Sequence, residues 1–191
     1  MKHRAFVGRQ VTDIPEDALT IIAFNDLTFG MLNSAPHVIW ATAKGTALGV
    51  SNDSRYTPTT TYETFAFPRP TDAQRAAIAE AARFLVTARE YLHQQSVPGR
   101  ASTVKLSLTV MDNLLAEYRA GQGSPLADIT TLADAHDTLD AAVAAAYGWT
   151  GPISTEPIST GPINTGPINE SELLTRLLAL NLERAGAAVG A

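Results

Sequence analysis

The sequence predicts an α+β protein, with a small β-rich or mixed N-terminal part followed by a C-terminal helical bundle. Three observations lead to this prediction. β-prone runs dominate the first third of the chain, apolar residues recur at helical spacing from about residue 72 onward, and a Pro-rich repeat separates the last helix from the others. We therefore divide the chain into residues 1–70, 71–150, 151–170 and 171–191.

Strands are expected at both ends of the N-terminal part. Residues 3–11 and 18–24 are β-prone and are separated by Asp, Pro and Asp, so they predict two strands joined by a turn. From 27 to 43 the apolar positions fit a helix, which Pro36 should break or kink. Aromatic residues and threonines in 61–67 favour a further strand, which ends at the prolines that follow.

Helices are expected in the rest of the chain. Thr71 and Gln74 have capping-box spacing at the start of a long helix over 72–95. Apolar residues three and four apart predict two further helices over 103–118 and 130–147. Glycines follow the second and third of these helices and should end them, at Gly121 and Gly148. Together the three helices indicate a small bundle.

Residues 151–170 consist of four tandem pentapeptides, GPIST, EPIST, GPINT and GPINE. Proline fixes φ and removes a donor, so we expect an extended linker whose isoleucines contact a surface. Asn169 then caps a last helix, whose leucines between 173 and 182 form a wide apolar stripe. We expect this stripe to dock on the 130–147 helix, and Trp149 to pack over the end of that helix.

Composition excludes several classes of protein. With no cysteine, the chain has neither disulfides nor thiolate metal ligands. No apolar run approaches the roughly 18 residues that a membrane span needs, and no signal peptide is evident, so we expect a cytoplasmic protein without a membrane partner. The net charge of −5 argues weakly against nucleic-acid binding, but residues 1–70 carry six basic and six acidic groups. The acidity therefore belongs to the C-terminal part.

Few of the groupings that catalysis requires are present. The chain has no glycine-rich loop between a strand and a helix, no Gly-x-Ser-x-Gly motif, and four scattered histidines without metal-ligand spacing. Acidic residues such as Asp134, Asp137 and Asp140 have the spacing of a solvated helix face. We assign no catalytic residue and no metal ligand, and consider a stand-alone enzyme the least favoured interpretation.

The stretch from 44 to 61 is the best candidate site. Its candidate DNA-binding residues are Lys44, Arg55, Tyr56, Thr57, Thr59, Thr60 and Thr61. Hydroxyls and backbone amides hold phosphates, an arginine addresses guanine edges, and a tyrosine stacks or contacts sugar. Composition alone favours a simpler interpretation, a polar loop that leads into an edge strand.

A longer motif runs through the same region. It comprises Ser34, His37, Trp40, Gly45, Leu48 and Gly49, then Arg55, Tyr56 and a Tyr-x-x-Phe-x-Phe-Pro run before a helix. This motif resembles the end of the target-recognition domain in class I SAM-dependent DNA methyltransferases of type II restriction-modification systems, including the large MmeI-like enzymes. Segments 139–149 and 172–185 are similar to C-terminal helices of that family, and 68–78 to the entry of the spacer helix in type I specificity subunits.

The resemblance implies an adenine-N6 DNA methyltransferase system, in which this part reads double-stranded DNA and another domain flips and methylates the base. Residues 1–70 would then be a partial target-recognition region, 71–150 a spacer helix and bundle, and 171–191 a docking helix. The family's Asn/Asp-Pro-Pro-Tyr/Phe loop and its glycine-containing SAM-binding strand end are absent. We therefore expect S-adenosylmethionine to bind to a catalytic methyltransferase domain or subunit, not to this chain.

The repeat at 151–170 and a shorter stretch between helices depart from the family pattern. Both departures suggest a detached fragment, a degraded remnant, or a subunit that works with a separate catalytic protein. The alternative from another class is a helical protein–protein interaction module that has no DNA-binding activity and binds through its leucine stripe.

Overall fold

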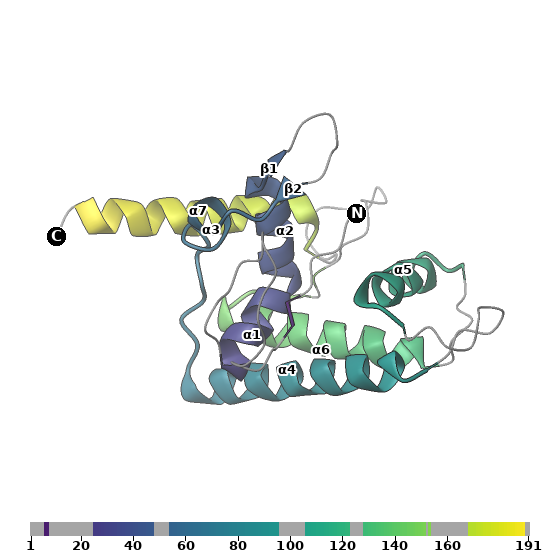
Figure 1. Ribbon diagram of the computed structural model, residues 1–191. Helices are drawn as coiled ribbons and strands as arrows, with labels where there is room; N and C mark the ends of the chain where they lie inside the picture. Colours follow the sequence, from purple (N-terminus) through teal and green to yellow (C-terminus); the bar gives the residue numbers. More distant parts are fainter. Residues whose placement is uncertain are drawn as a thin grey trace, which may run out of the picture.

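The computed structural model describes residues 6–7, 25–47, 54–95, 106–122, 128–151, 153 and 168–189. The helices in this part are α1 (Asp26–Asn33), α2 (Ala35–Lys44), α3 (Pro58–Thr61), α4 (Asp72–His93), α5 (Leu108–Arg119), α6 (Ile129–Ala146) and α7 (Glu170–Val189). Two short strands, β1 (Thr46–Ala47) and β2 (Ser54–Arg55), pair antiparallel with Thr46 opposite Arg55. Figure 1 shows this arrangement.

The prediction of an α+β fold is wrong, because the described residues form an all-α structure apart from the single ladder of two-residue strands. The 61–67 segment, predicted as a strand, begins in α3 and continues as a turn and coil. Pro58 stands in the first turn of α3, where its missing N–H costs nothing, and the hydroxyls of nearby threonines bond to carbonyls three or four residues back. The predicted strands at 3–11 and 18–24 lie outside the described residues, apart from Phe6 and Val7, which are not in a strand.

The helices begin and end largely where their capping residues predict. Thr71 and Gln74 form the predicted capping box of α4, with both reciprocal hydrogen bonds present. The predicted break near Pro36 is confirmed: α1 ends at Asn33, and the proline lies in the first turn of α2. Glycines with positive φ follow α5 and α6 as expected, namely Gly121 and Gly148.

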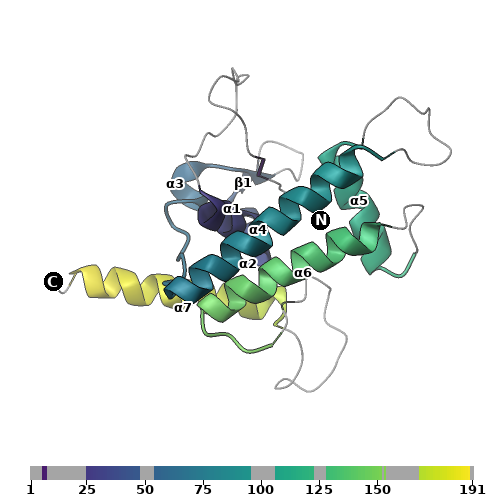
Figure 2. The ribbon, with the colours of Figure 1, turned by 90° about the horizontal axis from the view of Figure 1, so that it is seen from below.

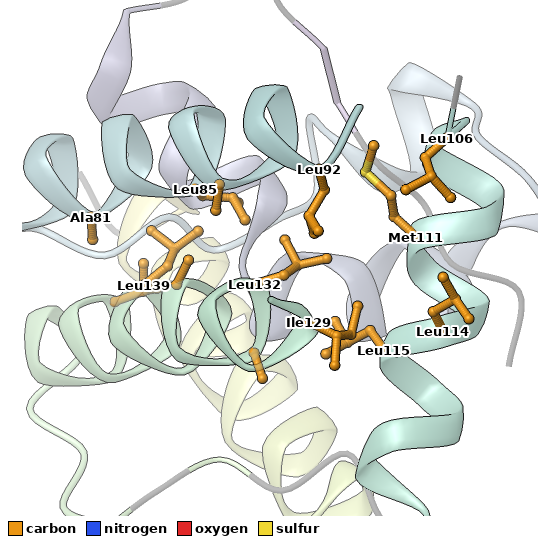
Figure 3. Close-up of a cluster of buried hydrophobic side chains, with 14 of the residues drawn as sticks. Ala81, Leu85, Leu92, Leu106, Met111, Leu114, Leu115, Ile129, Leu132 and Leu139 are labelled. Atoms are coloured by element: carbon orange, nitrogen blue, oxygen red, sulfur yellow. The ribbon is translucent and has the colours of Figure 1, made fainter. Parts of the chain in front are cut away.

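The main core lies between α4, α5 and α6, with α1 crossing α4 (Figures 1 and 3). α4 and α6 run side by side in opposite directions (Figure 2), and Gln74 at the start of α4 donates to the carbonyl of Ala145 at the end of α6. Buried apolar side chains from the facing sides of α4 and α6, together with residues of α5, fill this core. The largest of these are Ile78, Leu85, Leu92, Met111, Ile129, Leu132 and Leu139.

One acidic side chain is partly buried beside this interior. Asp140 on α6 was predicted to lie on a solvated face, but its Oδ1 accepts a 2.7 Å hydrogen bond from the backbone N–H of Ala35, at the N-terminus of α2. Burial raises the pKa of the Asp140 carboxyl to about 7. The side chain therefore satisfies a helix N–H that would otherwise lack an acceptor inside the α2 helix.

A second core joins α2 to α7. Leu173 and Leu177 are fully buried against Ile39 and Trp40, so the main helical partner of α7 is α2 and not the predicted 130–147 helix. Asn169 caps α7 as predicted, by accepting from the N–H of Glu172. The C-terminal end of α7 extends away from the rest of the molecule in both ribbon views (Figures 1 and 2).

The residues that precede α7 also contribute to the second core. Trp149 stacks on Tyr147 with 4.2 Å between ring centroids and is partly buried, in agreement with its predicted packing role. Ile153 and Ile168, from the first and last pentapeptides, form a parallel β-bridge beside them. Residues 154–167, between these two isoleucines, lie outside the described part of the chain.

Candidate nucleic-acid interface

The candidate residues follow one another from the C-terminal end of α2, through β1 and β2, to α3. This region lies on the side of the molecule opposite α4 (Figure 1). It is built on the second core, because Trp40 of α2 is almost fully buried there and its indole N–H donates to the hydroxyl of Thr64 at 3.3 Å. The buried middle of α2 thus supports the polar residues that follow the helix.

Lys44 is the last residue of α2 and its side chain is exposed. Its Nζ lies 5.0 Å from the ring centroid of Trp40, one helical turn earlier, in a cation–π arrangement. A positive charge at a helix C-terminus is also favourable to the helix dipole. These contacts hold the lysine stem against the protein, while the ammonium group remains accessible to an anion.

Arg55 and Tyr56 occupy β2 and the residue after it. The backbone of Arg55 pairs with Thr46 across the two-stranded ladder; its side chain is outside the described structure. Tyr56 is half-buried, and its hydroxyl lies 3.2 Å from Nε2 of His37 on α2. The ring of Tyr56 also packs edge-on against Phe6, with 5.5 Å between centroids. Tyr56 is therefore held by contacts within the protein.

The threonines differ in how far they are exposed. Thr57 is the N-cap residue of α3, and its carbonyl accepts from the hydroxyls of Thr60 and Thr61. Thr61 is fully buried, whereas Thr57 and Thr60 are partly buried. Thr59 is exposed. A ligand that approaches α3 from solvent would consequently meet Thr59 first, and would not reach Thr61 in this conformation.

Electrostatics around the candidate interface are mixed. Glu63, in the turn after α3, is exposed and places a negative charge next to this helix. Other arginines are engaged elsewhere: Arg184 donates to the carbonyl of Phe67, and Arg89 is buried and donates to Asn33.

Two contributors were not recognised as such from the sequence. His37 appears in the family motif, but nothing in the sequence shows that its ring contacts Tyr56, 19 residues later. The packing of Lys44 on Trp40 could have been predicted, because residues four apart lie on one helix face. The interface therefore combines a local contact that spacing reveals with a long-range contact that only the fold reveals.

The described residues contain neither a metal-binding cluster nor a parallel sheet. They contain no group of three histidines, aspartates or glutamates that could hold a metal ion. They also contain no parallel sheet, at whose strand ends α/β proteins bind nucleotide-like cofactors such as S-adenosylmethionine. Among the described helices, none is both long and apolar enough to cross a membrane.

Comparison with known proteins gives a match among solved structures only. No protein-family model and no curated protein matches this chain. Among solved structures, the chain is similar to the type IIL restriction-modification enzyme MmeI in complex with DNA, with a TM-score of 0.56 and 25% identity over 86% of this chain. The match spans 17% of the MmeI chain. The chain is therefore related to part of a restriction-modification enzyme.

Proposed function

We propose that this chain is a DNA target-recognition part of an adenine-N6 methyltransferase or restriction-modification system and does not transfer the methyl group itself. The observation that carries the proposal is the similarity over 86% of the chain to an enzyme solved with DNA. The motif from Ser34 to Pro68, which resembles the end of a target-recognition domain, supports the assignment of this chain to that part of such an enzyme. In this proposal, catalysis and S-adenosylmethionine binding belong to another domain or subunit.

The proposed contacts with DNA come from the end of α2 and from β2 and α3. Lys44 and Thr59 are exposed there, and the backbone of Arg55 lies between them in sequence, in β2. A lysine and a threonine hydroxyl suit phosphate oxygens, whereas an arginine suits either phosphate or a guanine edge. Tyr56 and Thr61 have hydrogen bonds within the fold, so we assign them to the support of this surface rather than to its contact layer.

Titration of a labelled mixed-sequence DNA duplex at low salt tests the proposal. We expect the wild type to bind and Arg55→Ala to bind roughly tenfold more weakly, because a charge-assisted hydrogen bond contributes about 1.5–3 kcal/mol. Arg75→Ala is the matched control, since Arg75 is exposed at the start of α4, away from the proposed surface. An equal loss of DNA affinity in Arg55→Ala and Arg75→Ala would contradict the assignment of the site. If the wild type does not bind DNA, either alone or with a methyltransferase subunit, the proposed function is wrong.

A second function is favoured by α7. Leu178 and Leu182 are 44% and 64% exposed on this helix. Exposed leucines one helical turn apart suit a protein partner. A pull-down with the wild type and with a Leu178→Ser, Leu182→Ser double variant distinguishes the two functions. Recovery of a partner that is unrelated to DNA modification and depends on the leucines supports an interaction module. Recovery of a catalytic methyltransferase subunit supports the first proposal.

A further inference from the structure

The ring of His37 is enclosed in the protein and both of its nitrogens have polar neighbours. The residue is fully buried on α2; Nδ1 lies 3.0 Å from the carbonyl oxygen of Leu32, and Nε2 lies 3.2 Å from the hydroxyl of Tyr56. A carbonyl oxygen can only accept, so Nδ1 carries a proton. In the neutral ring with Nδ1 protonated, Nε2 accepts the proton of the Tyr56 hydroxyl.

Aromatic neighbours fix the two rings relative to each other. The centroid of His37 lies 4.9 Å from that of Phe65, 5.5 Å from that of Phe6 and 5.8 Å from that of Tyr56. Such tilted and edge-on pairs have preferred geometries. Tyr56 therefore has one orientation in which its ring packs and its hydroxyl donates to Nε2.

The position of Tyr56 in the chain gives this bond a consequence. Tyr56 directly follows Arg55 at the end of β2 and directly precedes Thr57, the N-cap of α3. Fixing Tyr56 on α2 therefore fixes the backbone on both sides of it, from the arginine to the first turn of α3. A preformed backbone reduces the entropy that would be lost on binding a ligand.

We propose that His37 is a positioning residue for DNA binding: by accepting the hydroxyl proton of Tyr56, it holds the segment from Arg55 to Thr59 in its binding conformation. Tyr56 then acts through His37 and not by touching DNA. This inference rests on the proposed function. It changes the role expected for Tyr56 from the sequence, and gives a role to a histidine to which the sequence assigned none.

Substitutions that each preserve one of the two hydrogen bonds test the inference. The amide oxygen of Gln reaches the place of Nε2, so His37→Gln keeps an acceptor for Tyr56. The amide nitrogen of Asn reaches the place of Nδ1, so His37→Asn keeps only the bond to Leu32. We expect DNA binding of His37→Gln to be close to that of the wild type, and that of His37→Asn to be roughly fivefold weaker, the effect of one hydrogen bond.

Tyr56→Phe keeps the aromatic packing and removes the hydroxyl, so the test does not depend on the histidine variants folding. We expect the same roughly fivefold loss. The double variant Tyr56→Phe, His37→Asn should bind DNA no more weakly than either single variant, because the two substitutions remove the same hydrogen bond. Tyr62→Phe, which leaves the His37–Tyr56 bond in place, is the control and should bind like the wild type.

The outcomes separate this inference from the proposed function. If the wild type binds duplex DNA and Arg55→Ala weakens it, but Tyr56→Phe binds as tightly as the wild type, His37 has no positioning role. Additive losses in the double variant would show that Tyr56 acts independently of His37, which also overturns the inference. If the wild type does not bind DNA at all, the proposed function fails first. Thermal unfolding of each variant shows whether a loss of binding merely follows a loss of fold.

Discussion

Gly30 allows α1 to cross α4 at short distance. A Cβ added at this position would lie 2.9 Å from Cγ2 of Ile78 and 3.2 Å from Cβ of Ala82. Alanine would gain about 1 kcal/mol of helix propensity, but overpacking costs about 1–3 kcal/mol, so we expect Gly30→Ala to be destabilised by roughly 1 kcal/mol.

Urea unfolding measures this effect. Gly186→Ala is the matched control, because Gly186 also lies in a helix and an added Cβ would have no neighbour within 4 Å. That variant should be slightly stabilised by its helix propensity. A stabilised Gly30→Ala would mean that α1 and α4 do not approach as closely as the structure shows.

Asp140 makes the stability of the fold depend on pH. Its pKa is raised to about 7 by burial, against an ordinary value of 3.8, although the Ala35 N–H opposes this shift. The folded state therefore binds this proton more tightly than the unfolded state does. The resulting stabilisation of the fold is complete below about pH 4 and is lost as the pH rises to about 7. The Asp140→Asn substitution would keep an acceptor for the Ala35 N–H without introducing a group that becomes charged.

We expect the free energy of unfolding of the wild type, relative to that of Asp140→Asn, to fall by about 2 kcal/mol between about pH 5 and about pH 8. Urea titrations at the two pH values measure this difference. Asp134→Asn is the control, because Asp134 is exposed on the same helix and is not among the groups that shift the pKa of Asp140. Parallel pH profiles for wild type and Asp140→Asn would contradict the assignment.

At single positions, the sequence shows which residue types suit phosphate but not whether their side chains are exposed to solvent. Lysine, arginine and hydroxyls between 44 and 61 are residue types that suit phosphate, and Lys44 and Thr59 are exposed. Thr61 has the same side chain as Thr59 but lies in the interior, because the turn of α3 directs its hydroxyl to the carbonyl of Thr57. Chemical type can be read from one position, whereas burial depends on the neighbours that the fold supplies.

Among the elements, the amphipathic helices could be predicted and the short aromatic segment could not. α4 and α6 have apolar residues along one face and capping or stop residues at their ends, and both lie close to their predicted bounds. The 61–67 segment is rich in β-prone residues, but Phe65 and Phe67 pack edge-on in a coil, with 4.8 Å between centroids. β-propensity mainly reflects packing on a half-buried surface, which a turn can also provide.

α7 offers a test of its own docking. Leu177 is fully buried in the second core, while Leu182, five residues later, is 64% exposed. Leu177→Ala should lower the free energy of unfolding by about 3 kcal/mol, as is usual for a buried leucine, and Leu182→Ala by less than about 0.5 kcal/mol. Urea unfolding gives both values. Equal effects would indicate that α7 does not pack on α2 through Leu177.

For the whole molecule, the number of helices after residue 70 was easier to predict than how they pack. α7 was expected against α6, yet α2 supplies the surface through Ile39 and Trp40. A leucine stripe determines that a helix must be buried, but several apolar faces could cover it. Across the predicted division at residue 70, Met31 of α1 shares the main core with residues of α4 and α6.

The salt dependence of duplex binding tests the central claim that the surface from Lys44 to Thr59 contacts a phosphate backbone. Affinity of the wild type should fall linearly with the logarithm of the salt concentration, by a slope of about 0.9 for each phosphate contacted. Lys44→Ala should lower the magnitude of that slope by about 1, while Arg75→Ala should leave it unchanged. Binding that does not vary with salt, or an unchanged slope in Lys44→Ala, would contradict the account.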